Sequence, residues 1–192
     1  MGYNKVKLAL LAGGLALSAS VGAAGPTAAM LANTCAGCHG TNGASNGPAT
    51  PTIAGMSADF FVDKMKEYQA GTMHSTIMGR IAKGYTEEEI KAMADYFASQ
   101  PYVAHAQSVD KAKASAGKKL HNSAKCEKCH EDGGKKGDEA GKLAGQWLPY
   151  LQNVMDDFRT GKSEMPKKMA KRVENLSEAD VDALLQYYAG QD

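Results

Sequence analysis

Aromatic residues are scarce in this chain of 192 residues: they make up 7% of it, and only one is Trp. A globular protein of this length needs bulky apolar side chains to fill its core, so something else is expected to occupy the interior. An excess of one charge is missing too, because 22 Lys and Arg stand against 21 Asp and Glu. This balance argues against nucleic acid as a partner, and the 43% hydrophobic content is typical of a folded globular protein.

Long hydrophobic runs are also missing, apart from one at the N-terminus. Two lysines precede the apolar stretch from Leu8 to Leu17, and small residues follow it as far as Ala24. This order is typical of a secretory signal peptide, and the stretch is well short of the roughly 20 apolar residues that span a membrane. We predict that residues 1–24 are a signal peptide cleaved after Ala23 or Ala24, with a retained membrane anchor as the alternative. The mature protein would then lie in the periplasm without a membrane span.

Cysteine is limited to four residues, which form two CxxCH motifs, at residues 35–39 and 126–130. Four cysteines could make two disulfides, hold a zinc ion or attach a cofactor. The motifs lie 91 positions apart, and the similarity between the two halves extends beyond them. Gly55, Phe60, Met65, Tyr68 and Gly71 align with Gly145, Tyr150, Met155, Phe158 and Gly161 at an offset of 90, and Met78, Thr86, Glu87, Ile90 and Tyr96 align with Met169, Ser177, Glu178, Val181 and Tyr187 at 91. The pattern predicts an internal duplication.

The duplication predicts an all-α protein of two tandem domains, residues 25–100 and 109–192, joined by a linker at residues 101–108. Each half has a short helix leading into its CxxCH motif, a polar loop, a central helix and a final helix whose apolar residues recur at three and four positions. The boundaries expected from local signals are helix starts at about Thr27 and Asp110, caps at Ser57, Thr86 and Ser177, and helix ends at Gly71 and Gly161.

The His that follows each CxxC pair separates the chemical alternatives. A dithiol oxidoreductase does not need that His, and one zinc site shared by both motifs would leave the duplication unexplained. Two Cys on one helical turn can instead bond to the vinyl groups of a haem while the adjacent imidazole ligates the iron. The sequence therefore predicts two class I cytochrome c-like domains with two covalently bound haem c groups. The attachment residues would be Cys35, Cys38, Cys126 and Cys129, and the proximal ligands His39 and His130.

A methionine at a matching distance from each proximal His is the predicted second axial ligand. That distance is 39 residues to Met78 in the first half and 39 residues to Met169 in the second. Methionine ligation raises the reduction potential relative to two His ligands, which suits an acceptor of electrons from a flavin or a quinol. A rival spacing of 35 residues selects His74 and Met165, an unlike pair, and it leaves open whether Met165 rather than Met169 is the second ligand.

Four longer stretches carry further sequence patterns. They are residues 35–43 (CAGCHGTNG), 75–85 (STIMGRIAKGY), 120–130 (LHNSAKCEKCH) and 143–152 (LAGQWLPYLQ), the last followed by Asp157-Phe-Arg159. Together they resemble the dihaem cytochrome subunit of flavocytochrome c sulfide dehydrogenase, over essentially the whole chain after residue 24. The resemblance implies a periplasmic heterodimer in which an FAD-bearing flavoprotein subunit oxidises sulfide, and this chain passes the electrons to a soluble cytochrome c.

On this interpretation the chain is not an enzyme by itself, because haem occupies every Cys and no thiolate remains to attack sulfur. The alternative is a freestanding two-domain dihaem cytochrome c that shuttles electrons to a terminal oxidase or reductase. A haem enzyme, such as a peroxidase, would need an iron with a displaceable ligand, and two matched methionines argue against it. His105 and His121 are expected to have packing or surface roles.

Overall fold

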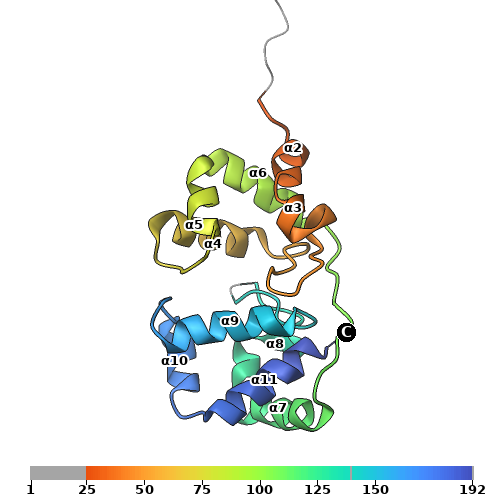
Figure 1. Cartoon of the computed structure of the whole chain (residues 1–192), viewed down its shortest axis with the longest axis vertical. Coiled ribbons are helices and arrows are strands. Elements are labelled where there is room, and N and C mark those ends of the chain that lie inside the picture. Colours follow the sequence, from red (N-terminus) through yellow and green to blue (C-terminus); the bar gives the residue numbers. More distant parts are fainter. Residues whose placement is uncertain (1–24, 139, 192) are drawn as a thin grey trace, which may run out of the picture.

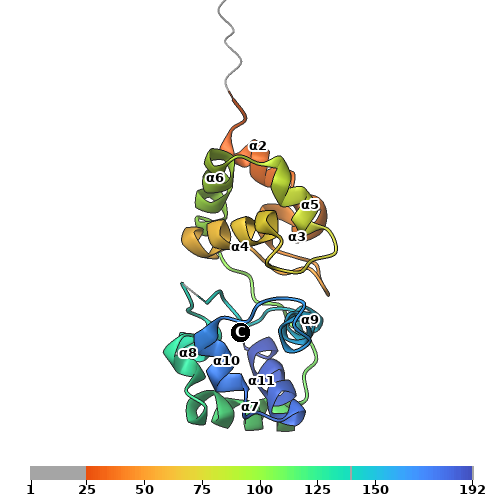
Figure 2. The ribbon, with the colours of Figure 1, turned by 90° about the vertical axis from the view of Figure 1, so that its left-hand side faces the viewer.

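The computed structural model describes residues 25–138 and 140–191, which form two helical domains and contain no strand. Figure 1 shows the N-terminal domain above the C-terminal one, with the connecting segment running down one side, and the view turned by 90° keeps the same two lobes (Figure 2). The all-α prediction is confirmed for these residues. No helix among them has the length and apolar character to cross a membrane. The predicted signal peptide, residues 1–24, lies outside the described residues.

The elements follow the duplicated order that the sequence predicts. The N-terminal domain contains α2 (Ala28–Asn33), α3 (Ala36–His39), η2 (Thr41–Gly43), α4 (Ala58–Ala70), α5 (Met78–Ile81), η3 (Ala82–Gly84) and α6 (Glu87–Ala98). The C-terminal domain contains α7 (Lys111–Ser123), η4 (Cys126–Lys128), α8 (Glu131–Gly134), α9 (Leu148–Arg159), α10 (Lys167–Val173) and α11 (Glu178–Ala189). The short helix, central helix and final helix of each half are thus α2, α4 and α6 in one domain and α7, α9 and α11 in the other.

Helices begin where the local side-chain chemistry predicts. Ser57 accepts a hydrogen bond from a backbone N–H in the first turn of α4, and so satisfies a donor that has no partner inside the helix. Thr86 and Glu89 form a reciprocal capping box at the start of α6, and Ser177 and Asp180 form another at the start of α11. These predicted caps are confirmed.

The first and last helices of each domain pack against each other, α2 on α6 and α7 on α11. In the C-terminal domain, Gly117 of α7 lies so close to α11 that a Cβ atom there would collide with the carbonyl oxygen of Ala183. The missing side chain lets the two helix backbones approach closely. In the N-terminal domain, Ile90, Met93 and Phe97 of α6 are at most 1% exposed and form the centre of the core.

Several short elements are absent from the sequence prediction, namely α5, α10 and the turns η2 and α8 in the loops that follow the motifs. With four and seven residues, α5 and α10 are too short to show the apolar repeat from which the longer helices are predicted. The loops turn sharply at Asn42 and Asp132, whose φ angles of 55° and 50° are left-handed. These short elements matter because α5 and α10 carry the two predicted methionine ligands.

The segment between the domains is not helical from residue 101 to residue 110. It lies along the C-terminal domain, because Tyr102, His105 and Gln107 each hydrogen-bond to backbone groups in residues 144–148. The segment that the sequence marks as a linker is therefore fastened to the second domain rather than free in solvent.

Candidate functional site

The first CxxCH motif forms one helical turn directly after α2. The N–H of His39 donates to the carbonyl oxygen of Cys35 at 2.9 Å, and Gly40 then turns the chain with a φ of 75°, which glycine adopts readily. The Cys35 side chain is half-buried and that of Cys38 is exposed, and both thiols are free. Burial raises the pKa of the Cys35 thiol, so it is held protonated near neutral pH.

The imidazole of His39 is fixed in one tautomer. The ring is buried, and its Nδ1 lies 2.9 Å from the carbonyl oxygen of Pro51. A carbonyl oxygen only accepts, so Nδ1 carries the proton and Nε2 keeps its lone pair. Burial also lowers the pKa of His39, which keeps the ring neutral. A neutral imidazole oriented through its other nitrogen is the form that ligates a metal.

Met78, the predicted second ligand of the first domain, lies at the start of α5 and is half-buried. Met78 and Cys35 pack against the same apolar core, which α2, α4 and α6 form. The structure therefore brings a predicted attachment thiol and the predicted ligand together in one core. The rival His74 is exposed, and its Nδ1 lies 2.9 Å from Oδ2 of Asp157 in the other domain.

The second motif has the same backbone hydrogen bond but a different turn. The N–H of His130 donates to the carbonyl oxygen of Cys126 at 2.9 Å, yet Lys125 has a φ of 60° and the turn that follows is a 3-10 turn. The second motif is thus a helical turn like the first, but of the 3-10 type. Burial, aided by the charge of His121, lowers the pKa of His130 to about 4. In the described part of the chain, the buried Nδ1 of His130 has no hydrogen-bond partner.

The hydroxyl of Tyr188 in α11 lies 3.0 Å from Nδ1 of the buried His121, and the Tyr188 ring centroid lies 6.0 Å from that of His130 in the second motif. Burial raises the pKa of the Cys126 thiol and of the Tyr188 hydroxyl, so both remain protonated. His121 packs in the core of the domain, as the sequence leads us to expect.

The second domain offers two methionines at half-buried positions. Met169 lies in α10, and Met165 directly precedes Pro166, the N-terminal cap of that helix. Among the described residues, neither packs against the apolar cluster of α9 and α11 that Cys126 joins. The close packing of Met78 in the first domain is thus not repeated, and the contacts of α10 do not separate Met169 from Met165.

A buried pair of hydrogen bonds connects the domains. The N–H of Thr52 donates to Oε1 of Gln146 at 3.0 Å, and Nε2 of Gln146 donates to the carbonyl oxygen of Thr52 at 2.7 Å. Both residues are 0% exposed. His105 hydrogen-bonds to the Thr52 hydroxyl and stacks on Trp147 with ring centroids 4.5 Å apart. The sequence does not predict this contact, because Thr52 and Gln146 carry no motif that pairs them, and its one signal is the position of Gln146 in the 143–152 stretch.

The donor set of each domain fits a covalently attached haem. Each motif presents two free thiols and an imidazole, buried at His39 and half-buried at His130, whose pKa burial lowers. The two motifs lie in separate domains, which does not fit one zinc site built from both. Across residues 25–138 and 140–191, no group of three or more His, Cys, Asp or Glu side chains is arranged to hold a metal ion.

Two protein-family models match the chain, one in each domain. The cytochrome c model matches residues 23–101, and the model of cytochrome c oxidase, cbb3-type, subunit III matches residues 112–187. Both matches include a CxxCH motif. They agree with two cytochrome c domains in tandem.

Similar proteins fall into two groups that differ in coverage. Cytochrome c4 of Azotobacter vinelandii is 30% identical over 199 residues, 92% of each chain. The cytochrome subunit of sulfide dehydrogenase from Chlorobaculum tepidum is 46% identical, but over 68 residues, which are 35% of this chain and 61% of that protein. The crystal structure of reduced cytochrome c4 from Pseudomonas stutzeri matches with a TM-score of 0.75 and 26% identity, covering 88% of this chain and 100% of that one.

The similarity to the sulfide dehydrogenase subunit covers less of the chain than the sequence motifs predict. Similarity to the sulfide dehydrogenase subunit, expected over the whole chain after residue 24, extends over about a third of it. Similarity to cytochrome c4 extends through both domains in sequence and in structure. The chain therefore belongs to the cytochrome c4 family, electron carriers built from two class I cytochrome c domains.

Proposed function

We propose that the protein is a dihaem electron carrier of the periplasm. In each domain the two thiols of the CxxCH motif attach a haem c, and the motif's His and a distant Met are the axial ligands. The residues are Cys35, Cys38, His39 and Met78 in the first domain and Cys126, Cys129, His130 and Met169 in the second. A bound haem supplies one-electron oxidation and reduction at its iron.

The observation that carries this proposal is the hydrogen bond between Nδ1 of His39 and the carbonyl oxygen of Pro51 at 2.9 Å. It holds the ring in one orientation, leaves Nε2 as the ligating atom and makes that atom more basic. The apolar core shared by Cys35 and Met78 keeps water away from the same region. Axial ligands that water does not displace from the iron favour electron transfer over the binding of small molecules.

We further propose that the protein works as a freestanding carrier that delivers electrons to a terminal oxidase or reductase. Similarity to cytochrome c4 along 92% of the chain supports this role, and so does the match of the second domain to a cbb3-type oxidase subunit model. On this proposal the chain itself catalyses no reaction of a substrate, because all four thiols are bound to haem.

A second candidate is the cytochrome subunit of a sulfide dehydrogenase. The 46% identity over 68 residues favours it. Its partners would be an FAD-containing flavoprotein subunit, which oxidises sulfide, and a soluble cytochrome c that accepts the electrons. The short span of the match makes it the weaker of the two candidates.

Two measurements test the proposal. A pyridine haemochrome assay on the purified protein should give two haems per chain, and a count of one or none would contradict it. Mild purification from the native periplasm then separates the candidates. A cytochrome that elutes alone, and that sulfide does not reduce when flavoprotein fractions are added, supports the freestanding carrier. Co-elution with a yellow flavoprotein in equal amounts would favour the sulfide dehydrogenase.

A further inference from the structure

One peptide group connects the C-terminal domain to the imidazole of His39. The carbonyl oxygen of Pro51 accepts the Nδ1–H of His39 at 2.9 Å. The N–H on the other side of the same peptide group, that of Thr52, donates to Oε1 of Gln146 at 3.0 Å. The Pro51–Thr52 peptide group is therefore hydrogen-bonded at both ends, once within its own domain and once across the domain boundary.

The side chain of Gln146 has a single orientation in this arrangement. Oε1 must meet the N–H of Thr52 and Nε2 must meet its carbonyl oxygen, so an exchange of the two amide atoms would break both hydrogen bonds. Gln146 and Thr52 are 0% exposed, so water does not compete for these groups. The neighbouring Trp147 adds a bond from its indole N–H to the carbonyl oxygen of Ser45 at 3.3 Å.

Hydrogen bonds that follow one another through linked groups polarise one another, and each bond is strengthened by about 10–30%. An amide whose N–H is bonded to a good acceptor has a more negative carbonyl oxygen, which draws more strongly on the proton it accepts. At Pro51 that proton is the Nδ1–H of His39. The imidazole then becomes a stronger electron donor at Nε2, and a stronger donor favours an oxidised iron.

We propose that Gln146 of the C-terminal domain is a positioning residue for the haem of the N-terminal domain, where it orients His39 through the Pro51–Thr52 peptide group and lowers the reduction potential. This inference rests on the proposed function, since it requires a haem at His39.

The duplicated domains do not contain this link twice. In the alignment at an offset of 90, the equivalent of Gln146 is Met56, which has no amide to bond to a peptide group. Nδ1 of His130 has no hydrogen-bond partner among the described residues, whereas Nδ1 of His39 has one. The second domain therefore acts on the haem site of the first, and within residues 25–138 and 140–191 His130 has no matching contact in the opposite direction. The two haem sites differ for this reason despite their common motif.

The decisive variant is Gln146→Leu in the holoprotein, which removes both hydrogen bonds at nearly constant volume. At a fixed solution potential, we expect the ratio of oxidised to reduced haem in the N-terminal domain to fall about threefold, a fraction of the free energy of one hydrogen bond. The ratio for the C-terminal haem should not change. A redox titration followed by NMR resolves the two haems through their separate haem methyl signals.

Gln107→Leu is the matched control, because Gln107 is a half-buried glutamine of the segment between the domains that hydrogen-bonds beside Gln146. Its amide bonds to the carbonyl oxygens of Gln146 and Ala189 and to the N–H of Leu148, but not to Thr52. A general loosening of the backbone around residue 146 would affect both variants, whereas the proposed link affects only Gln146→Leu. We expect Gln107→Leu to leave the ratio of oxidised to reduced haem unchanged in both domains.

Unchanged haem ratios in Gln146→Leu, or equal shifts in the two variants, would overturn the proposal. If Gln146→Leu does not fold, Gln146→Met provides a more adaptable side chain that also lacks the amide, with the same expected shift. The pyridine haemochrome count distinguishes failure of the proposed function from failure of the role proposed for Gln146. A wild-type protein with fewer than two haems contradicts the proposed function, whereas two haems with no shift contradict only the role of Gln146.

Discussion

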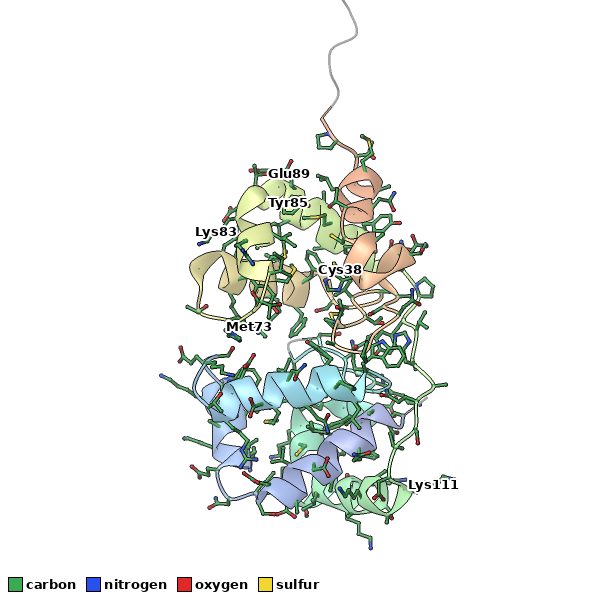
Figure 3. All side chains as sticks on the ribbon, in the orientation of Figure 1. Cys38, Met73, Lys83, Tyr85, Glu89 and Lys111 are labelled. Atoms are coloured by element: carbon green, nitrogen blue, oxygen red, sulfur yellow. The ribbon has the colours of Figure 1, made fainter. Side chains whose placement is uncertain are left out.

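His74 of the first domain and Asp157 of the second form an ion pair across the domain boundary, with Nδ1 and Oδ2 2.9 Å apart. Beside it, the N–H of His74 donates to the Ser163 hydroxyl at 2.9 Å, and Nζ of Lys162 lies 3.5 Å from the Asp157 carboxylate. Figure 3 shows the adjacent Met73 at the edge of the upper domain that faces the lower one. The contact joins the segment after α4 to the last turns of α9 and to the loop that follows it.

The ion pair predicts a pH-dependent contribution to stability. The hydrogen bond from His74 is the main cause that holds the pKa of Asp157 below its ordinary value of 3.8. A lowered carboxylate pKa stabilises the folded protein above that ordinary value, and the contribution is lost as the pH falls through the folded-state pKa. Asp157→Ala should therefore lower the free energy of unfolding by less than about 1 kcal/mol at neutral pH, because the pair is partly exposed. Denaturant titrations of the holoprotein at neutral and acidic pH measure the difference.

Asp156→Ala is the control for this prediction. Asp156 is the adjacent carboxylate, and its one ion pair is with Lys162 at 3.9 Å within its own domain. Its replacement should change the free energy of unfolding by less than Asp157→Ala does. A loss for Asp157→Ala that is the same at both pH values would show that the ion pair is not its source.

A second pair of variants tests the methionine assignment in the C-terminal domain. Met169→Ala should remove one of the two sets of methionine-to-iron NMR signals, because the sulfur ligand of that haem is gone, and the reduction potential of that haem should fall. Met165→Ala should leave both sets in place. The reverse result would assign Met165 as the ligand and Met169 as a packing residue.

The close crossing of α7 and α11 predicts a large effect of a small side chain. In Gly117→Ala, the new Cβ would collide with the carbonyl oxygen of Ala183, and the two helices must move apart. We expect a loss of about 1–3 kcal/mol in the free energy of unfolding, the usual range for overpacking. Gly84→Ala is the control, because a Cβ at Gly84 meets no atom within 4 Å. Similar losses for the two variants in chemical denaturation would contradict the steric explanation.

Local signals predict much of this fold. Thr86 with Glu89, and Ser177 with Asp180, fix the starts of the final helices through atoms only three residues apart. The CxxCH motif likewise places its His by one hydrogen bond to the first Cys. Such contacts depend on neighbours in the sequence, so the sequence alone is enough to predict them.

Contacts between residues far apart in the chain are not predicted from the sequence. Thr52 and Gln146 are 94 residues apart, and neither residue type is characteristic of a domain boundary. The two CxxCH motifs read alike, yet the left-handed backbone at Lys125 makes the second turn different from the first. The methionines proposed as ligands, Met78 and Met169, lie on helices too short to show an apolar repeat. Tertiary packing decides these features, and a single sequence carries little record of it.

The hydroxyl of Tyr188 is expected to stabilise the C-terminal domain, because it is the hydrogen-bond partner of the buried His121. In Tyr188→Phe, Nδ1 of His121 loses its partner 3.0 Å away. A buried polar group left without a partner costs about 1–3 kcal/mol, and chemical denaturation of the holoprotein should show a loss of that size. Tyr187→Phe is the matched control, because in the described part of the chain the hydroxyl of this buried neighbour has no side-chain hydrogen bond. We expect its loss to be smaller. Equal losses for the two variants would mean that ring packing, rather than the hydrogen bond to His121, makes Tyr188 important.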